Sequence, residues 1–397
     1  MDESRVRRRR VFYIPGYDPI HPRRYRELYR KEGKAQAEIS GYELNLSPRQ
    51  GENYGWCVEG RIGGEETRAD VEVLVWSDIV RSSMETNIAG TYLQLVRTAW
   101  AYIASGALRR LMWLRKGPVI AALYPIVILL LQLAVALILA RIGASLLALI
   151  HPWAAGLALA LVPATLIWFR RRDGKIYAYY LMHDYAYSAQ HGGANPPELE
   201  ERMALFGEMI AAALRDDVDE VLVVGHSSGA HLGVSILADL IRDGRAEGGA
   251  TLSFLTLGHV VPMVSFLPEA HRLRADLQFL SEQDGITWVD VTAPGDGCAF
   301  ALCDPVAVSG VARPQQIWPI VFSAAFTQTL SPERWSALKR RYFRLHFQYL
   351  CAFDRPKDYD YFQITAGPLT LGQRYRGRAS SRSRIDVPAS KFTSVAA

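Results

Sequence analysis

The segment from Val119 to Phe169 constrains the fold more than any other part of the chain, because it carries a single full charge, Arg141. It holds two apolar runs, roughly residues 119–140 and 145–169, of about 22 to 25 residues each. At about 1.5 Å per helical residue, each run covers about 33 Å or more, enough to cross a hydrocarbon core of about 30 Å. Buried core helices are the alternative, but such helices rarely run this long without a charge. The segment therefore predicts a transmembrane hairpin over residues 118–170.

Basic residues flank the hairpin on both outer sides. They are Arg109, Arg110, Arg115 and Lys116 before it, and Arg170, Arg171, Arg172 and Lys175 after it. The expected connection between the two spans holds only Arg141 and His151. Because Lys and Arg concentrate on the cytoplasmic side of membrane proteins, both outer ends and nearly all of the chain are expected to face the cytoplasm. Trp113 and Trp168 stand where interfacial aromatic residues are expected. A lid that lies on the membrane instead of crossing it is the alternative, which the length of the runs disfavours.

The two ends of the chain and its cysteines set further expectations. The start, MDESRVRRRR, has no apolar stretch suited to a signal peptide, and its arginines either touch anionic lipid headgroups or form a solvated tail. Residues 373–397 are rich in Ser and Arg without periodicity, which predicts a disordered tail. The four cysteines, Cys57, Cys298, Cys303 and Cys351, lack paired metal-type spacing, and a cytoplasmic setting predicts free thiols.

Outside the hairpin, short apolar strands alternate with helical patterns, which is typical of an α/β sheet. The predicted strands include RVFYIPG at 10–16, VEVLVWSD at 71–78, EVLVVG at 220–225, TLSFLTLGH at 251–259 and ITWVDV at 286–291. Helical patterns are expected to run from 86 to 114 and on into the first span, and over most of 332–353. Residues 1–117 and 171–372 are thus predicted to form the two halves of one domain with a mostly parallel sheet flanked by helices.

The sequence GHSSG, from Gly225 to Gly229, places a serine on a sharp corner between an apolar strand and a helix-like segment. A strained strand-to-helix turn needs small residues on both sides, which Gly225 and Gly229 supply. Such a turn lifts the Ser227 hydroxyl clear of the sheet edge. The helix that follows directs its free N–H groups at the same place, where they can stabilise a developing oxyanion. A plain Gly/Ser-rich turn is the alternative interpretation.

The serine corner and its setting resemble the α/β-hydrolase superfamily, most closely its lipases and esterases. The resemblance covers approximately Arg10–Trp76 and Ile176–Pro368. It implies that Ser227 is the nucleophile and that the N–H of Ser228 is one oxyanion donor. It also implies a second donor in the loop FYIPGYDP, from Gly16 or Tyr17. The family's usual His-Gly is Pro-Gly here, and Pro15 has no N–H, so the donor must come from a later residue.

The family's chain order is serine, then acid, then histidine, and it leaves one base and two rival acids. A serine needs a histidine to take its proton and a carboxylate to hold that histidine's tautomer. His346 is the only histidine that follows either candidate acid, although an ordinary interfacial histidine is its alternative reading. Asp296, between two glycines after a strand, is favoured over Asp304, while Asp290 lies inside the strand.

The remaining histidines are expected to have other roles. His226, inside the turn, is expected to shape the pocket, and His259 and His271 are expected to be structural. His271 opens HRLRAD, which matches a short acyltransferase pattern but falls in the middle of a predicted helix without that family's other features.

The catalytic interpretation and the hairpin support each other. The oxyanion loop precedes the hairpin and the nucleophile follows it, so an odd number of spans would separate them across the bilayer. Two spans return the chain to its starting face, where the two halves of the domain can join.

The sequence predicts a membrane-anchored serine hydrolase that cleaves esters of a hydrophobic or lipid-like acyl substrate. Acyl transfer by the same serine and a non-catalytic hydrolase-like membrane scaffold are the alternatives. The sequence contains no phosphate loop, nucleotide fingerprint or metal cluster, so no cofactor, metal or nucleic-acid partner is expected.

Overall fold

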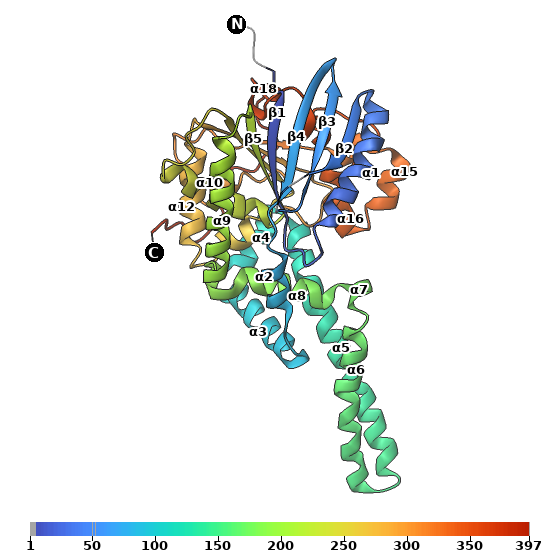
Figure 1. Cartoon of the computed structure of the whole chain (residues 1–397). Coiled ribbons are helices and arrows are strands. Elements are labelled where there is room, and N and C mark those ends of the chain that lie inside the picture. Colours follow the sequence, from blue (N-terminus) through green and yellow to red (C-terminus); the bar gives the residue numbers. More distant parts are fainter. Residues whose placement is uncertain (1–4, 50, 52, 397) are drawn as a thin grey trace.

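The computed structural model describes residues 5–49, 51 and 53–396, and it shows an α/β body from one end of which a long helical hairpin projects (Figure 1). The body is built on one eight-stranded sheet with helices on both faces. This architecture confirms the predicted α/β class and the mostly parallel sheet.

The sheet has the strand order β2-β3-β4-β1-β5-β6-β7-β8. The strands are β1 (Arg8–Ile14), β2 (Glu43–Pro48), β3 (Gly55–Ile62), β4 (Glu65–Val73), β5 (Glu220–His226), β6 (Thr251–Leu257), β7 (Ile286–Thr292) and β8 (Ile320–Ser323). The six strands β4, β1, β5, β6, β7 and β8 run parallel to one another. The pairs β2–β3 and β3–β4 are antiparallel. Ile14 pairs with Gly225, so the loop after β1 and the serine corner after β5 emerge side by side.

Alternate residues of the central strands enter two separate cores. In β1, Val11 and Tyr13 pack into one core and Phe12 and Ile14 into the other, because successive side chains of a strand point to opposite faces. One core is covered by α1 (Arg23–Ser40), α15 (Pro332–Leu338), α16 (Tyr342–His346), η3 (Phe347–Leu350), α17 (Tyr361–Ala366) and α18 (Leu371–Arg374). The other is covered by α9 (Pro197–Leu214), α10 (Gly229–Arg242) and α12 (His271–Ser281). The prediction that most of 332–353 is helical is confirmed, and the helix there is divided into three short pieces.

Several shorter helices lie near the base of the hairpin or along the edge of the sheet. They are α2 (Ser77–Met84), α3 (Ile88–Ala104), α4 (Ala107–Leu114), α7 (Asp173–Ile176), α8 (Ala178–Ala189), η2 (Gln190–Gly193), α11 (Pro262–Ser265), α13 (Pro305–Val308) and α14 (Phe326–Thr329). The predicted continuous helix from 86 into the first span is wrong. Gly106 takes a left-handed φ of 76° that ends α3, and Arg115 is extended between α4 and the hairpin.

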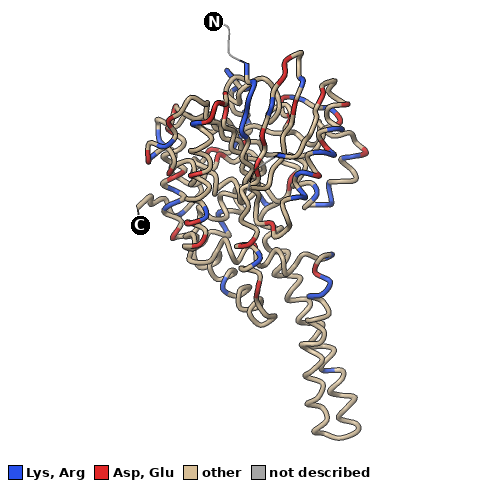
Figure 2. The backbone as a smooth tube through the Cα atoms, viewed as in Figure 1, with Lys and Arg blue, Asp and Glu red and all other residues tan. Residues whose placement is uncertain are grey.

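The hairpin consists of α5 (Lys116–Ala148) and a returning arm made of η1 (Pro152–Ala160) and α6 (Leu161–Arg170). Both arms are long and apolar enough to cross a membrane. Figure 2 shows that the outer part of the hairpin carries one basic residue and no acidic one. The connection was expected to hold both Arg141 and His151, but it lies at 149–151, and Arg141 is inside α5. Gly143 alone does not end the helix, whereas Pro152 cannot continue it.

The N-terminal arginines do not lie where lipid headgroups would meet the hairpin. β1 begins at the end of the body away from the hairpin (Figure 1). There Arg9 Nε donates to Glu220 Oε2 at 2.6 Å, and both side chains are fully buried. Arg8 pairs with Asp217, and Arg10 pairs with Glu72 and Asp216. Residues 8–10 are therefore part of the sheet and not a solvated tail, and residues 1–4 lie outside the described residues.

The prediction of a disordered C-terminal tail is corrected for residues 373–396. Ile385 forms a parallel bridge with Cys303, and Ala389 N–H donates to Val308 O. Arg274 Nε donates to Ser394 O at 2.7 Å. The segment is thus bound to the body, in part through the buried guanidinium of Arg274. Its own composition does not reveal these partners.

Candidate functional site

The serine corner has the strained geometry that its sequence predicts. Ser227 adopts φ of 56°, a left-handed conformation that costs a non-glycine residue free energy. A Cβ built on Gly229 would lie 2.1 Å from Ile14 O, and one on Gly225 would lie 2.6 Å from Gly229 O. Neither glycine can therefore be replaced without moving backbone. The packing holds β1, β5 and α10 together around a partly exposed serine.

The histidine and the favoured acid are joined by a short hydrogen bond. His346 Nδ1 lies 2.7 Å from Asp296 Oδ2, and both residues are buried. Two further donors hold the carboxylate: Cys298 N–H reaches Oδ1 at 2.9 Å, and Tyr349 OH reaches Oδ2 at 3.1 Å. Because the Nδ1 atom donates to this carboxylate, the Nε2 atom of a neutral ring is left as the proton acceptor.

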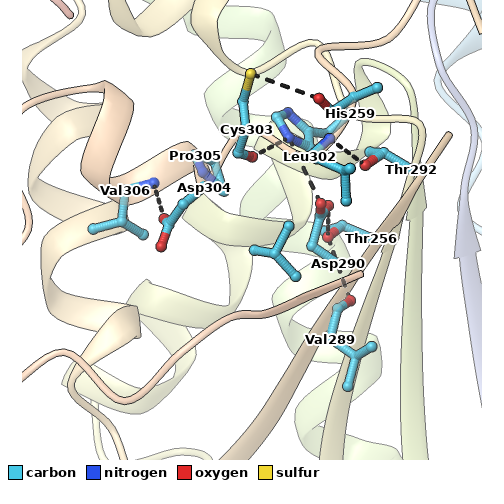
Figure 3. Close-up of polar contacts among 12 residues, drawn as sticks. Thr256, His259, Val289, Asp290, Thr292, Leu302, Cys303, Asp304, Pro305 and Val306 are labelled. Atoms are coloured by element: carbon cyan, nitrogen blue, oxygen red, sulfur yellow. Dashed lines mark hydrogen bonds and ion pairs between the residues drawn. The ribbon is translucent and has the colours of Figure 1, made fainter. Parts of the chain in front are cut away.

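Asp304, the rival acid, has a structural role instead. Its Oδ1 accepts from the N–H groups of Val306 and Ala307 at the start of α13, at 3.0 and 3.1 Å. Its Oδ2 accepts from Gln316 Nε2 at 2.9 Å. Figure 3 shows the carboxylate turned toward the Val306 amide. Of the two acids left open by the sequence, Asp296 is the one on the His346 ring.

His226 contacts His346 through both a hydrogen bond and its ring. Its Nε2 donates to the His346 carbonyl at 3.0 Å, and the two rings lie 4.8 Å apart between centroids. Burial, followed by the nearby His346, lowers the pKa of His226 to about 3, so its ring is neutral at physiological pH. His226 therefore shapes the site and carries no proton in it, in line with the sequence prediction.

Ser227 and His346 line the same cleft, which encloses about 760 Å³ of empty space, including the part open to solvent. Tyr17, Tyr180 and Phe343 contribute aromatic walls to it. Among the described residues, Ser227 Oγ makes no hydrogen bond to His346 in this structure. A hydrogen bond between nucleophile and base is often long before substrate binds, so the shared cleft is the relevant observation.

The predicted oxyanion donors border the serine. A Cβ built on Gly16 would lie 3.3 Å from Ser227 Oγ, which places the loop after β1 directly against Ser227. Within the described chain, the N–H groups of Gly16, Tyr17 and Ser228 donate to no protein acceptor. All three residues line the cleft. These amides are consequently available to a ligand oxygen.

Asp184, on α8, is a cleft residue that sequence reasoning missed. It lines the cleft beside Ser227, and among the described residues its carboxylate has no hydrogen-bond or ion-pair partner. Burial raises the pKa of Asp184 to about 7, and the nearby His346 acts in the opposite direction. Nothing in the local sequence MHDYAY distinguishes this acid, because only the packing of α8 over the cleft brings it to the serine.

A metal reading of the same site fits its geometry poorly. Ligand atoms of Asp296, Cys298 and His346 lie within 4.8 Å of one another. The acid and the imidazole already bond each other, however, and one Asp296 oxygen also accepts the Cys298 amide. Burial raises the pKa of the Cys298 thiol well above its usual value, which disfavours the thiolate that a metal needs. All four cysteines are free, as predicted.

His259 and His271 contact structural partners. His259 Nε2 donates to Cys303 O at 3.0 Å (Figure 3). His271 Nδ1 accepts from Arg274, and Asp276, at the end of HRLRAD, accepts from Arg242 at 2.6 Å. The acyltransferase-like pattern is thus part of an ion-pair network on α12, with no member in the serine cleft.

Comparisons of the chain with protein-family models, with curated proteins and with solved structures found no match.

Proposed function

We propose that this protein is a membrane-anchored serine hydrolase of the α/β-hydrolase type, which cleaves esters of hydrophobic or lipid-like acyl groups. The observation that carries the proposal is the strained Ser227 at the end of β5, in one cleft with a His346–Asp296 hydrogen bond of 2.7 Å. A strained serine, a base and an orienting carboxylate, in that chain order, are the parts that acyl transfer to a serine requires.

In the proposed reaction, Ser227 Oγ attacks the ester carbonyl carbon while His346 Nε2 takes the hydroxyl proton. Asp296 keeps the proton of the imidazole on Nδ1 and stabilises the imidazolium that forms. The tetrahedral intermediate collapses with cleavage of the bond to the alcohol, which leaves with the proton from Nε2. Water then attacks the acyl-enzyme by the same route, releasing the carboxylic acid and restoring Ser227.

The negative oxygen of each tetrahedral intermediate would be held by backbone N–H groups. Ser228 N–H, at the start of α10, is one donor, and Gly16 or Tyr17 N–H is the other. Their lack of protein acceptors supports this assignment. Such donors each contribute about 10²- to 10³-fold to turnover in comparable sites.

The hairpin would place this site at the cytoplasmic face of a membrane. The carboxyl ends of β1 and β5, where the cleft lies, face the end of the body that carries the hairpin (Figure 1). Basic residues on both outer flanks of the hairpin favour the cytoplasmic side for the body. Substrates dissolved in the bilayer would then be concentrated at the cleft.

Labelling with a fluorophosphonate tests the function directly. Detergent-solubilised wild-type protein should be labelled and should hydrolyse nitrophenyl esters. Ser227→Ala should lose labelling and at least about 10³-fold in turnover, with the fold intact because little core volume changes. Ser188→Ala, in the same cleft but outside the proposed machinery, is the matched control and should still be labelled. A wild-type protein that stays unlabelled and inactive would favour the scaffold alternative.

A further inference from the structure

A second pocket lies beside the serine cleft, between the base of the hairpin and the helices that pack on it. Its walls come from α3, α4, α5, α8 and α11, and it encloses about 500 Å³ of empty space, including the part open to solvent. The residues of α5 in its wall are Val119, Ala122, Leu123 and Ile126.

The chemistry of the pocket is almost entirely apolar. Apart from Thr98 and two tyrosines, every residue that lines it has an aliphatic side chain or is a methionine. The Tyr102 hydroxyl donates to Met263 O at 2.8 Å and is therefore already paired. No charged residue lines the pocket. It consequently suits a hydrocarbon, and it offers nothing to a headgroup, a phosphate or a cation.

The pocket adjoins the serine cleft through shared walls. Tyr185 and Met263 line both spaces. Along α5, Pro118 borders the serine cleft and the next residue, Val119, borders the apolar pocket. A flexible methionine is a side chain that can make room between two such spaces.

The other side of the pocket reaches the surface at apolar residues. Ile103 on α3 is 60% exposed and Leu123 on α5 is 37% exposed, and both line the pocket. Leu93, Val96 and Trp100 extend this exposed apolar surface along α3 with helical spacing. Exposed rows of this kind mark contact surfaces, and here the row lies next to the proposed membrane anchor.

We infer that this pocket between α3, α4 and α5 binds the acyl chain of a membrane lipid substrate, whose ester carbonyl reaches Ser227 past Tyr185 and Met263. The inference rests on the proposed hydrolase function and names its substrate class, long-chain acyl esters taken laterally from the bilayer. The apolar lining, the shared wall with the serine cleft and the opening beside the hairpin each support the same occupant.

Filling the pocket should select against long acyl chains. Ala122→Trp places an indole in the pocket, while Ala121→Trp, the matched control on the same helix turn, changes a residue that does not line it. For Ala122→Trp, kcat/KM on a nitrophenyl palmitate should fall about tenfold or more, because each buried methylene contributes roughly fourfold to affinity. Activity on the butyrate should stay near wild type, and Ala121→Trp should leave both unchanged. If Ala122→Trp fails to fold, Ala99→Phe, in the α3 wall, makes the same test.

A binding measurement separates this inference from the hydrolase proposal. Full-length Ser227→Ala protein in nanodiscs, which cannot turn over substrate, is incubated with a diazirine analogue of palmitic acid and illuminated. Crosslinks to pocket residues such as Leu123 or Met263, lost in the Ser227→Ala, Ala122→Trp double variant, would support the inference. Absent crosslinks, or crosslinks equal in both proteins, would overturn it. An equal fall of palmitate and butyrate activity in Ala122→Trp would also overturn it, whereas loss of all esterase activity in wild type would overturn only the hydrolase proposal.

Discussion

At the scale of single residues, the position of Asp296 is set by the backbone around it. Its N–H donates to Ala293 O at 2.8 Å in a tight turn just after β7, and the flanking glycines leave room for neighbouring rings. Gly295 lies against Trp335, and Gly297 lies against Tyr342. The turn directs the Asp296 carboxylate inward toward His346. Asp304, eight positions later, instead accepts from backbone N–H groups at the start of α13.

Asp296→Asn should therefore lower ester turnover by roughly 10³- to 10⁴-fold, because an amide stabilises the wrong tautomer of His346. Asp304→Asn is the matched control. It should leave turnover near wild type and cost about 1 kcal/mol of unfolding free energy. An amide oxygen still caps the helix, but the amide nitrogen can no longer accept from Gln316 Nε2. Steady-state kinetics and thermal unfolding of both variants check the pair. Equal losses of turnover would contradict the assignment of the acid.

Asp184 should make the stability of the protein depend on pH. Its pKa is about 7 in the folded state against 3.8 for an unperturbed Asp, because burial disfavours the charged form. The folded state thus holds a proton that the unfolded state has lost, and stability falls as pH rises from about 4 to 7. Above about pH 7 the cost levels off, on the order of 2 kcal/mol for this partly exposed side chain.

Asp184→Asn removes that titration, so its advantage in stability over wild type should grow between pH 4.5 and 7 and then stay constant. Unfolding of both proteins in the same detergent at several pH values measures the difference. Asp173→Asn, at the start of α7, is a control acid outside the cleft. Parallel curves for wild type and Asp184→Asn would show that Asp184 does not titrate in this range.

At the scale of elements, local sequence predicted what local physics determines. The apolar runs of β1 and β5 predict buried strands, and a serine between Gly225 and Gly229 predicts a tight corner, because each depends on neighbouring residues alone. The order of serine, acid and histidine, taken from the family resemblance, also predicted the pair that the structure joins, Asp296 with His346.

The elements that the sequence did not reveal depend on distant partners. β8 has only four residues and pairs with β7, so no pattern of its own identifies it. The C-terminal segment is ordered through Cys303, Val308 and Arg274, which lie far away in the chain. The packing of α8 brings Asp184 to the serine cleft, and the apolar pocket forms only where helices such as α3, α5 and α8 meet. The helix of the first span continues through Arg141 to Ala148, although the apolar run was expected to end at residue 140.

At the scale of the whole molecule, the hairpin divides into a part that belongs to the body and a part that does not. Near its base, Leu129 is fully buried, Tyr92 OH donates to Leu129 O, and Tyr124 OH donates to Ile176 O. Beyond it, residues 130–148 of α5 extend from the body with largely exposed apolar side chains. These residues span about 28 Å, close to the roughly 30 Å of a hydrocarbon core.

The apolar pocket, Trp168 and Arg141 can be located relative to these two parts of the hairpin. The apolar pocket, whose α5 residues are Val119 to Ile126, lies at the base of the hairpin, which would be at the level of the near interface if the hairpin crosses the membrane. Trp168 lies in the same region of the returning arm, with the Arg172 guanidinium 3.8 Å from its ring centroid. Arg141 lies seven residues before the end of α5, which is about 10 Å from the far end, where a long side chain can reach the opposite interface.

The hairpin should therefore cross the membrane and turn on the side opposite to the body. A short epitope inserted between Ile150 and His151, in the turn, should be protected from protease and antibody added to the cytoplasmic side of sealed vesicles. A tag after Ala397 should be accessible there, because Lys and Arg flank both outer ends of the hairpin.

The same epitope inserted in the 63–64 glycine turn, on the body, controls for the effect of insertion itself. Retained ester hydrolysis by each tagged protein shows that the two halves of the domain have joined. An epitope at 150 that is as accessible as the C-terminal tag would mean that the hairpin lies along the membrane, and the match of about 28 Å to the hydrocarbon core would then have no bearing on its topology.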